Sequence, residues 1–149
     1  MRAGDLAVEV PTVRVGDPAT RAVRIMTDEQ LPGLIVVDEA DRPRFVIPGS
    51  QVLRMLVSHY SGDAALARTI DEEHADEFWT DLGTRTVGDC MAPDRTRPAQ
   101  VLPDATLLEV AVAMSGQRSP LVAVVDTEQR LLGCITLNAL LTRLALPPG

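Results

Sequence analysis

The sequence lacks the features that mark secreted, membrane and metal-cluster proteins. Its two cysteines do not have the spacing of a metal motif, so we expect neither a zinc site nor a disulfide framework. No apolar run is long enough to cross a bilayer, and the first ten residues lack the apolar core of a signal peptide. We therefore expect a cytoplasmic protein with no membrane insertion.

Lysine is absent: all 14 basic residues are arginines, against 21 acidic residues, and the net charge is −7. Nucleic-acid-binding proteins usually present a basic face, so this balance argues against a nucleic acid as partner. A small phosphorylated ligand remains compatible with it, because a single arginine in a pocket can hold a phosphate through paired hydrogen bonds.

Recognisable catalytic motifs are missing as well. The chain has two histidines, His59 and His74, and neither lies in a motif. It contains no nucleophile elbow, Walker loop or dinucleotide fingerprint. Cys134 lies in an apolar stretch typical of a buried strand, where a thiol is usually a small core residue. We expect no catalytic residues and no enzyme activity.

What the sequence does contain is an internal repeat, found when the chain is compared with itself after a shift of 88 positions. No gap is needed, and the apolar pattern agrees between the identical positions. The residues that this shift superposes include Val13 and Val101, Met26 and Met114, Pro32 and Pro120, and the Val-Val-Asp stretches at 36–38 and 124–126.

Each copy has the same order of elements. An extended segment is followed by an amphipathic helix, a continuous apolar run, a polar turn, a second apolar run and a last amphipathic helix. The continuous runs at 34–37 and 121–125 predict strands buried on both faces. Short polar turns join them to the runs at 44–47 and 131–135, which predicts antiparallel hairpins. The unit is therefore β-α-β-β-α, and the fold class is α/β.

One such unit is too small to cover both faces of its own sheet. We therefore expect the two copies to pack against each other as a pseudo-symmetric pair, and not to fold as independent domains. The predicted boundaries are 1–60 for the first repeat, 61–85 for a linker helix and 86–149 for the second repeat.

These patterns resemble the cystathionine-β-synthase-type (CBS) domain family. The resemblance rests on the lead-in Val87-Gly88-Asp89-Cys90-Met91, the stretch 120–126 and the segment Gly133-Cys134-Ile135-Thr136. Ala3-Gly4-Asp5-Leu6 is the shorter lead-in of the first copy. The order and spacing of these segments, found twice, carry more weight than any one of them.

The resemblance implies a tandem pair of CBS domains that associates as a homodimer. It also implies an adenosine-containing ligand, such as AMP, ADP, ATP or S-adenosylmethionine, bound between the copies. Members of the family usually regulate an attached or associated protein. Because the repeats and the linker use up this chain, we expect a stand-alone module that acts on an unidentified effector protein.

In the family, the nucleotide site follows the pattern Gly-h-h-Thr/Ser-x-x-Asp, where h is apolar, the hydroxyl contacts phosphate and the carboxylate holds the ribose. In the second copy Gly133 and Thr136 match this pattern, but Ala139 stands in place of the aspartate. The corresponding residues of the first copy are Phe45, Pro48 and Gln51, of which Gln51 can still accept one hydrogen bond. The resemblance thus implies a weakened site, with the second copy as the better one.

The segment Arg118-Ser119-Pro120 precedes a strand that lines this cleft in the family, which makes Arg118 a candidate phosphate contact. The backbone of Cys134 and Ile135 is expected to line the base and the ribose. Two of these candidates have structural alternatives. Arg118 suits a solvated helix end, and Thr136 suits the N-cap of the last helix.

Between the copies, residues 64–79 have the pattern of a helix whose apolar stripe includes His74 and Phe78. One interpretation is a metal site, with His74 and neighbouring carboxylates as ligands. The other is an interface helix, whose acidic residues face water while Phe78 and Trp79 anchor a partner or dock the helix onto its own core. We favour the second and expect no metal.

Two functions follow from the sequence. The first is a regulatory module that senses an adenosine-containing ligand and modulates a partner. The second is a ligand-free scaffold for dimerisation and protein interaction, in which both nucleotide sites are degenerate.

Overall fold

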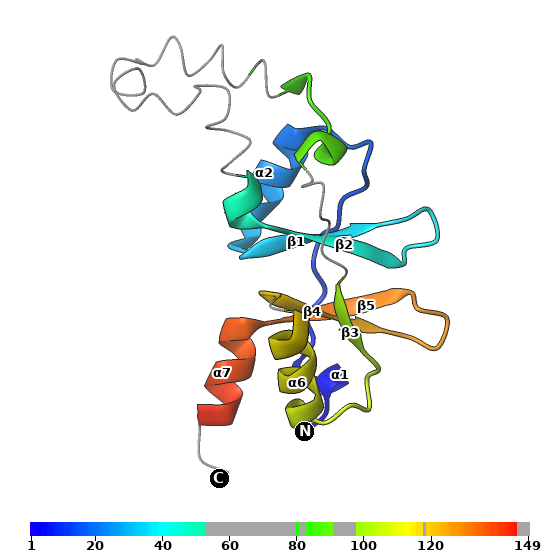
Figure 1. Ribbon diagram of the computed structural model, residues 1–149, viewed down its shortest axis with the longest axis vertical. Coiled ribbons are helices and arrows are strands. Elements are labelled where there is room, and N and C mark those ends of the chain that lie inside the picture. Colours follow the sequence, from blue (N-terminus) through cyan, green and yellow to red (C-terminus); the bar gives the residue numbers. More distant parts are fainter. Residues whose placement is uncertain (53–79, 81–82, 91–97, 118, 146–149) are drawn as a thin grey trace.

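The computed structural model describes residues 1–52, 80, 83–90, 98–117 and 119–145, and its two sheets lie face to face with helices on the outer sides (Figure 1). The elements of the first repeat are α2 (Ala19–Glu29), β1 (Gly33–Val37) and β2 (Pro43–Pro48). Those of the second are β3 (Ala99–Val101), α6 (Leu107–Gln117), β4 (Leu121–Val125), β5 (Leu131–Thr136) and α7 (Leu137–Ala145). Two short helices, α1 (Ala3–Leu6) and η1 (Val87–Cys90), precede the repeats.

The predicted β-α-β-β-α order is confirmed in the second repeat. In the first repeat the opening strand is reduced to a single parallel bridge between Val13 and Val36. Its last helix is described only from Gly49 to Val52. The linker helix predicted over 64–79, with His74, Phe78 and Trp79, lies outside the described residues. Within the described part of the chain, no helix has the length and apolar character needed to span a membrane.

Both predicted hairpins are antiparallel, and an aspartate builds each turn. The Oδ1 atom of Asp38 accepts hydrogen bonds from the backbone N–H groups of Ala40 and Arg42, at 2.9 and 3.0 Å. Asp126 does the same two and four residues further on, at 2.8 and 2.9 Å. Backbone hydrogen bonds to the charged carboxylate hold the pKa of both aspartates below the ordinary value.

The central strands β1 and β4 are buried along their whole length, as the continuous apolar runs predicted. Alternate residues of each strand serve different cores. In β1, Leu34 and Val36 pack among the helix-facing residues of their own repeat. Ile35 and Val37 pack against the sheet of the other repeat. The face-to-face contact between the sheets therefore holds the pseudo-symmetric pair together.

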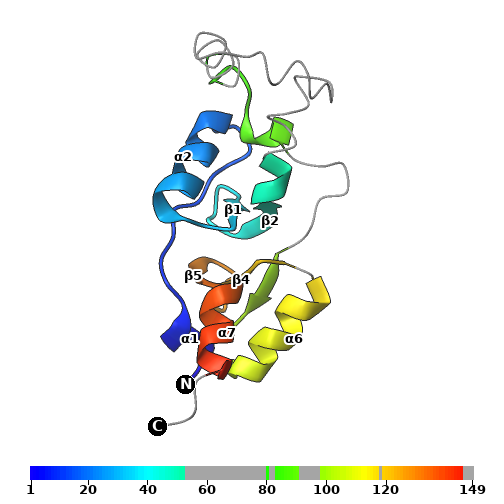
Figure 2. The same cartoon turned by 90° about the vertical axis from the view of Figure 1, so that its left-hand side faces the viewer.

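Each repeat is completed by the lead-in of the other repeat. The arm at 1–8 crosses to the second repeat, where the N–H of Ala3 donates to the carbonyl of Ala105 at 2.8 Å. The η1 lead-in crosses the opposite way, and the N–H of Val87 donates to the carbonyl of Asp17 at 2.8 Å. The side chains of Ala3 and Val87 are both fully buried. Figures 1 and 2 place α1 at the end of the molecule that holds α6 and α7, and Figure 1 shows η1, in green, beside α2.

The crossed arm makes a prediction about Ala3. Ala3→Asp places a carboxylate in the apolar core of the second repeat, which costs more than about 1 kcal/mol. For a chain of this size the melting temperature falls by about 2–4 °C for each kcal/mol. Hydrogen exchange should rise more in α6 and β5 than in α2 and β1. Ala40→Asp, in an exposed turn, is the control, and a rise confined to the first repeat would contradict the crossing.

Candidate ligand clefts

Two small clefts lie between the repeats and are related by the repeat symmetry. The first, here called the Gly133 cleft, encloses about 250 Å³ and is lined by Glu9, Val10, Thr12, Val37, Asp41, Leu131, Leu132 and Gly133. The second, the Phe45 cleft, encloses about 260 Å³ and is lined by Pro43, Arg44, Phe45, Pro98, Gln100 and Gln129. The shift of 88 positions carries Val10, Thr12 and Asp41 onto Pro98, Gln100 and Gln129.

The crossed lead-ins explain how the clefts are built. Residues that follow the α1 arm form one wall of the Gly133 cleft, and β5 of the second repeat forms another. In the Phe45 cleft, Pro98 and Gln100 lie opposite β2 of the first repeat. A molecule in either cleft therefore contacts both repeats at once.

The two clefts differ in charge. Glu9 and Asp41 line the Gly133 cleft, and in the part of the chain that the structure describes no basic residue lines it. Asp41 pairs with exposed Arg14 at 3.4 Å. Arg44 lines the Phe45 cleft together with the side-chain amides of Gln100 and Gln129, and no acidic residue is among the described residues that line it. The Phe45 cleft is thus the better electrostatic match for an anion.

Gly133 is also required by the backbone that crosses it. The peptide N–H and C=O of Cys134 pair with Val8 in both directions, at 2.9 and 3.0 Å. A Cβ atom on Gly133 would lie 2.8 Å from the carbonyl oxygen of Val8. Packing of the arm therefore accounts for this glycine without any ligand.

Cys134 and Ile135 are fully buried, and the Cys134 thiol lies in the core between the two sheets. Burial raises the pKa of the Cys134 thiol to about 11. The thiol therefore stays protonated near neutral pH, as expected for a core residue. Both backbone hydrogen-bonding groups of Cys134 are engaged by Val8.

The hydroxyl groups singled out by the sequence have partners inside the chain. The Oγ1 atom of Thr136 accepts a hydrogen bond from the N–H of Ala139 at 3.1 Å, which is the N-cap geometry of α7. Ser119 is buried and donates its hydroxyl proton to the carbonyl of Leu121 at 2.7 Å. The cap interpretation of Thr136 therefore has direct structural support.

A third and larger cavity, here called the apolar groove, encloses about 920 Å³ beside α6 and α7. Its lining residues are Pro32, Pro48, Gly49, Ser50, Ala111, Met114, Ser115, Ser119, Pro120, Leu137, Leu140, Leu141 and Leu144. Among the described residues that line it none is charged, so this part of the groove suits an apolar partner surface.

The structure does not bring the sequence-predicted site residues into one cavity. Gly133 lines a cleft, while Ser119 and Pro120 line the apolar groove. Gln51, Thr136 and Ala139 line none of these three cavities. Arg118 lies outside the described residues.

Sequence reasoning missed Arg44, Gln100 and Gln129 as cleft residues. The available signal was the repeat itself, because Arg44 and Phe45 stand at the positions of Leu132 and Gly133.

Comparison with known proteins identifies the family. The family model of the CBS domain matches residues 87–146. A solved CBS domain-containing protein of unknown function from Kribbella flavida is 40% identical, with a TM-score of 0.83, and the match covers 99% of this chain and 100% of that one. This chain belongs to the CBS-domain family. A search of the curated proteins found no match.

More distant CBS structures share the fold. CBSX2 from Arabidopsis thaliana is 17% identical over 96% of this chain and 93% of its own, with a TM-score of 0.69. A structure of CBSX2 in complex with AMP is 18% identical, covers 96% of this chain and 95% of that one, and has a TM-score of 0.65. The predicted α/β architecture of paired CBS repeats is confirmed.

Because Gly133 contacts Val8, we expect a larger residue at position 133 to lower the stability of the fold whether or not a ligand is bound. Gly133→Ala should lower the free energy of unfolding by about 1–3 kcal/mol, because the new methyl group displaces the crossing backbone. Gly116→Ala is the matched control: it lies in α6 with nothing within 4 Å of its Cβ position. Removing this helical glycine should stabilise the protein by up to about 1 kcal/mol. Denaturant unfolding measures both changes, and equal stability of Gly133→Ala and the wild type would contradict the packing role.

Proposed function

We propose that this chain is a CBS-pair regulatory module of the cytoplasm, which binds an adenosine-containing ligand between its repeats and modulates a partner protein. The observation that carries the proposal is the pair of pseudo-equivalent clefts, each with walls from both repeats. The AMP complex of CBSX2, which has the same fold, supports the ligand class. The proposal assigns no catalytic step to the chain.

The route from ligand to partner follows from the walls of the clefts. Glu9, Val10 and Thr12 follow directly after Val8, the residue that joins the arm to β5. A ligand that favours one spacing of the two repeats shifts the population toward that spacing. A change in the spacing of the two repeats alters the shape of the protein surface, and a partner protein can bind the altered surface.

Thermal unfolding tests the ligand class. The purified protein is screened with AMP, ADP, ATP, S-adenosylmethionine and NAD, each with and without magnesium. At a ligand concentration of 100 times Kd, binding stabilises the folded state by about 2.7 kcal/mol, which raises the melting temperature by about 5–10 °C. A flat response to the whole panel, from folded protein, would exclude the sensor function.

We also propose that the module is a homodimer held by the outer face of α6 and α7. Leu108 and Val112 on α6 are 72% and 66% exposed, and Leu141 and Leu144 on α7 are more than half exposed. A helix that is apolar on its outer side as well as its inner side normally has a partner there. These four side chains are apolar, and Leu141 and Leu144 also line the apolar groove, so a second copy of the same face complements it.

The first repeat does not offer an equivalent surface on its first helix. The shift of 88 positions places Thr20 and Arg24 of α2 at the positions of Leu108 and Val112. A contact between α6 of one chain and α2 of another would leave leucine and valine facing polar side chains. We therefore expect the second repeats of the two chains to meet each other.

The double substitution Val112→Glu and Leu141→Glu should convert the dimer to a monomer, because it places charges at the centre of the apolar contact. Light scattering after gel filtration should give twice the 16.1 kDa chain mass for the wild type and a single chain mass for the variant. Leu132→Glu, also exposed but on β5, is the control and should remain dimeric. A wild-type monomer, or a dimeric double variant, would refute this interface.

A ligand-free scaffold is the second candidate function. The hydroxyl groups of Ser119 and Thr136 form hydrogen bonds within the chain, which favours a scaffold because these groups are already engaged without a ligand. The small size of both clefts favours it too, since pockets for drug-sized ligands usually enclose about 300–1,000 Å³. The same thermal screen separates the two functions.

A further inference from the structure

We infer that residues at the tips of the two hairpins form a clasp, which must open before a ligand can enter either cleft. The clasp consists of Asp41 and Arg42 from the first hairpin and Glu128 and Leu131 from the second. This inference rests on the proposed function and specifies how ligand entry is regulated. Arg42 acts here as a positioning residue, which sets the spacing of the hairpins without contacting the ligand.

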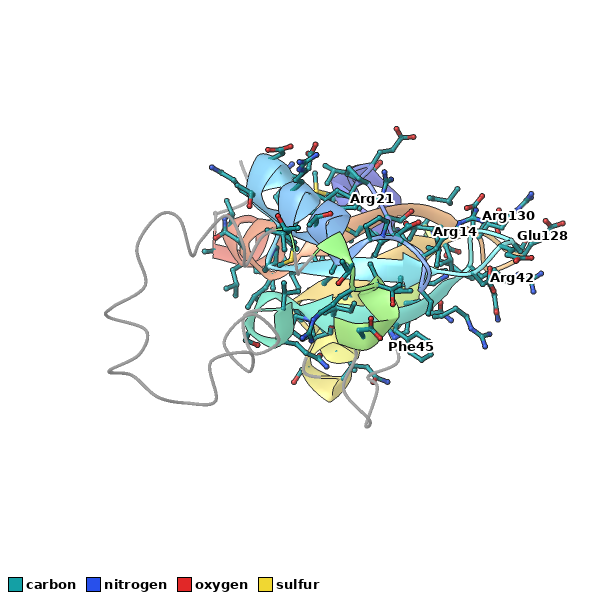
Figure 3. The ribbon with its side chains drawn as sticks, turned by 90° about the horizontal axis from the view of Figure 1, so that it is seen from above. Arg14, Arg21, Arg42, Phe45, Glu128 and Arg130 are labelled. Atoms are coloured by element: carbon teal, nitrogen blue, oxygen red, sulfur yellow. The ribbon has the colours of Figure 1, made fainter. Side chains whose placement is uncertain are left out.

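Two hydrogen bonds join the hairpin tips in the part of the chain that the structure describes. The N–H of Leu131 donates to the carbonyl of Asp41 at 2.9 Å. The Nε of Arg42 donates to the carbonyl of Glu128 at 3.1 Å, and Figure 3 shows these two residues together at the tips. Asp41, Arg42 and Glu128 are exposed, so water can replace both bonds when the tips separate.

The repeat symmetry would allow a second backbone hydrogen bond in the clasp, and Pro43 removes it. The shift of 88 positions carries Asp41 onto Gln129 and Pro43 onto Leu131. The equivalent of the bond from Leu131 to Asp41 would therefore run from residue 43 to the carbonyl of Gln129. Proline has no N–H group to donate. The clasp thus has one backbone hydrogen bond in place of two, and it opens more readily than a symmetric clasp would.

Each hairpin can keep its own shape when the clasp opens. Asp38 and Asp126 accept hydrogen bonds from the backbone of their own turns. Arg130, which stands at the position of Arg42 in the second repeat, also stays within its own hairpin. It pairs with Asp126 at 3.3 Å and with Glu128 at 2.7 Å. Opening therefore breaks the bonds between the hairpins and keeps the bonds within them.

The clasp lies between the two clefts. Two of its residues, Asp41 and Leu131, line the Gly133 cleft, and their symmetry-related partners line the Phe45 cleft. With the clasp closed, the Gly133 cleft encloses about 250 Å³, which is less than the roughly 300–1,000 Å³ usual for drug-sized ligands. A nucleotide therefore needs the hairpin tips to move apart. The measured affinity then depends on the fraction of molecules in which the clasp is open.

Hydrogen exchange of the ligand-free chain measures the clasp directly. Arg42→Ala removes one of the two bonds but keeps the backbone N–H that binds Asp38. The protection factor of the Leu131 N–H should fall about two- to tenfold, as expected for the loss of one hydrogen bond. Arg130→Ala is the matched control, because it removes the same charge from the equivalent position but no bond between the hairpins. Its protection factor should stay within about twofold of the wild type.

Isothermal titration with AMP and with adenosine then measures the effect on ligand entry. Arg42→Ala should bind both compounds more tightly than the wild type, by the factor by which Leu131 loses protection, because the open clasp is more populated. Arg130→Ala should stay within about twofold of the wild type. The loss of a positive charge would by itself weaken the binding of AMP, so tighter binding has the opposite sign from a simple charge effect.

The outcomes separate this inference from the proposed function. Unchanged protection of Leu131 in Arg42→Ala would overturn the clasp. Unchanged or weaker binding by Arg42→Ala, or equal tightening in Arg130→Ala, would overturn its control of ligand entry and leave an adenosine-binding module. If neither AMP nor adenosine binds the folded wild type, the inference is refuted. If no adenosine compound of the thermal screen binds, the proposed function is refuted with it.

Discussion

The contact between the two sheets is the constraint on which the rest of the structure depends. Each sheet has helices on its outer face, so its inner face needs the other sheet to exclude water. Ile35 and Val37 of one repeat meet Leu121 and Ala123 of the other, and this requirement makes the central strands apolar on both sides. Once the sheets are stacked, the lead-in segments run along their edges, and the clefts form where segment and strand meet.

The hairpins and helices were predictable because their signals are local. A continuous apolar run bounded by Asp38 or Asp126 predicts a buried strand and a turn, and the structure has both. The crossing of the lead-ins was not predictable, because it joins Ala3 to Ala105, about a hundred residues apart, through ordinary backbone hydrogen bonds. Nothing in the residue types near Ala3 indicates which repeat they complete.

The candidate site was predicted less well, because the same residue types can be required by the packing of the fold or by a ligand. Gly133 is required by the passage of Val8, and Thr136 caps a helix. Both therefore match the family pattern whether or not a nucleotide binds. Arg44 and Phe45 depart from that pattern, and only their place on a cleft wall gives them a candidate role.

The crossed arms also make the chain resemble a dimer with exchanged arms that has been fused into one polypeptide. A cut between the repeats would leave each fragment carrying the lead-in that belongs to the other. The arm also determines where an added domain would be attached. The sulfur of Met1 accepts a hydrogen bond from Arg143 near the end of α7, so the chain begins beside the final helix of the second repeat. A protein fused ahead of Met1 would therefore be attached at the end of the molecule formed by the second repeat, and the first repeat would lie at the opposite end, away from the fused protein.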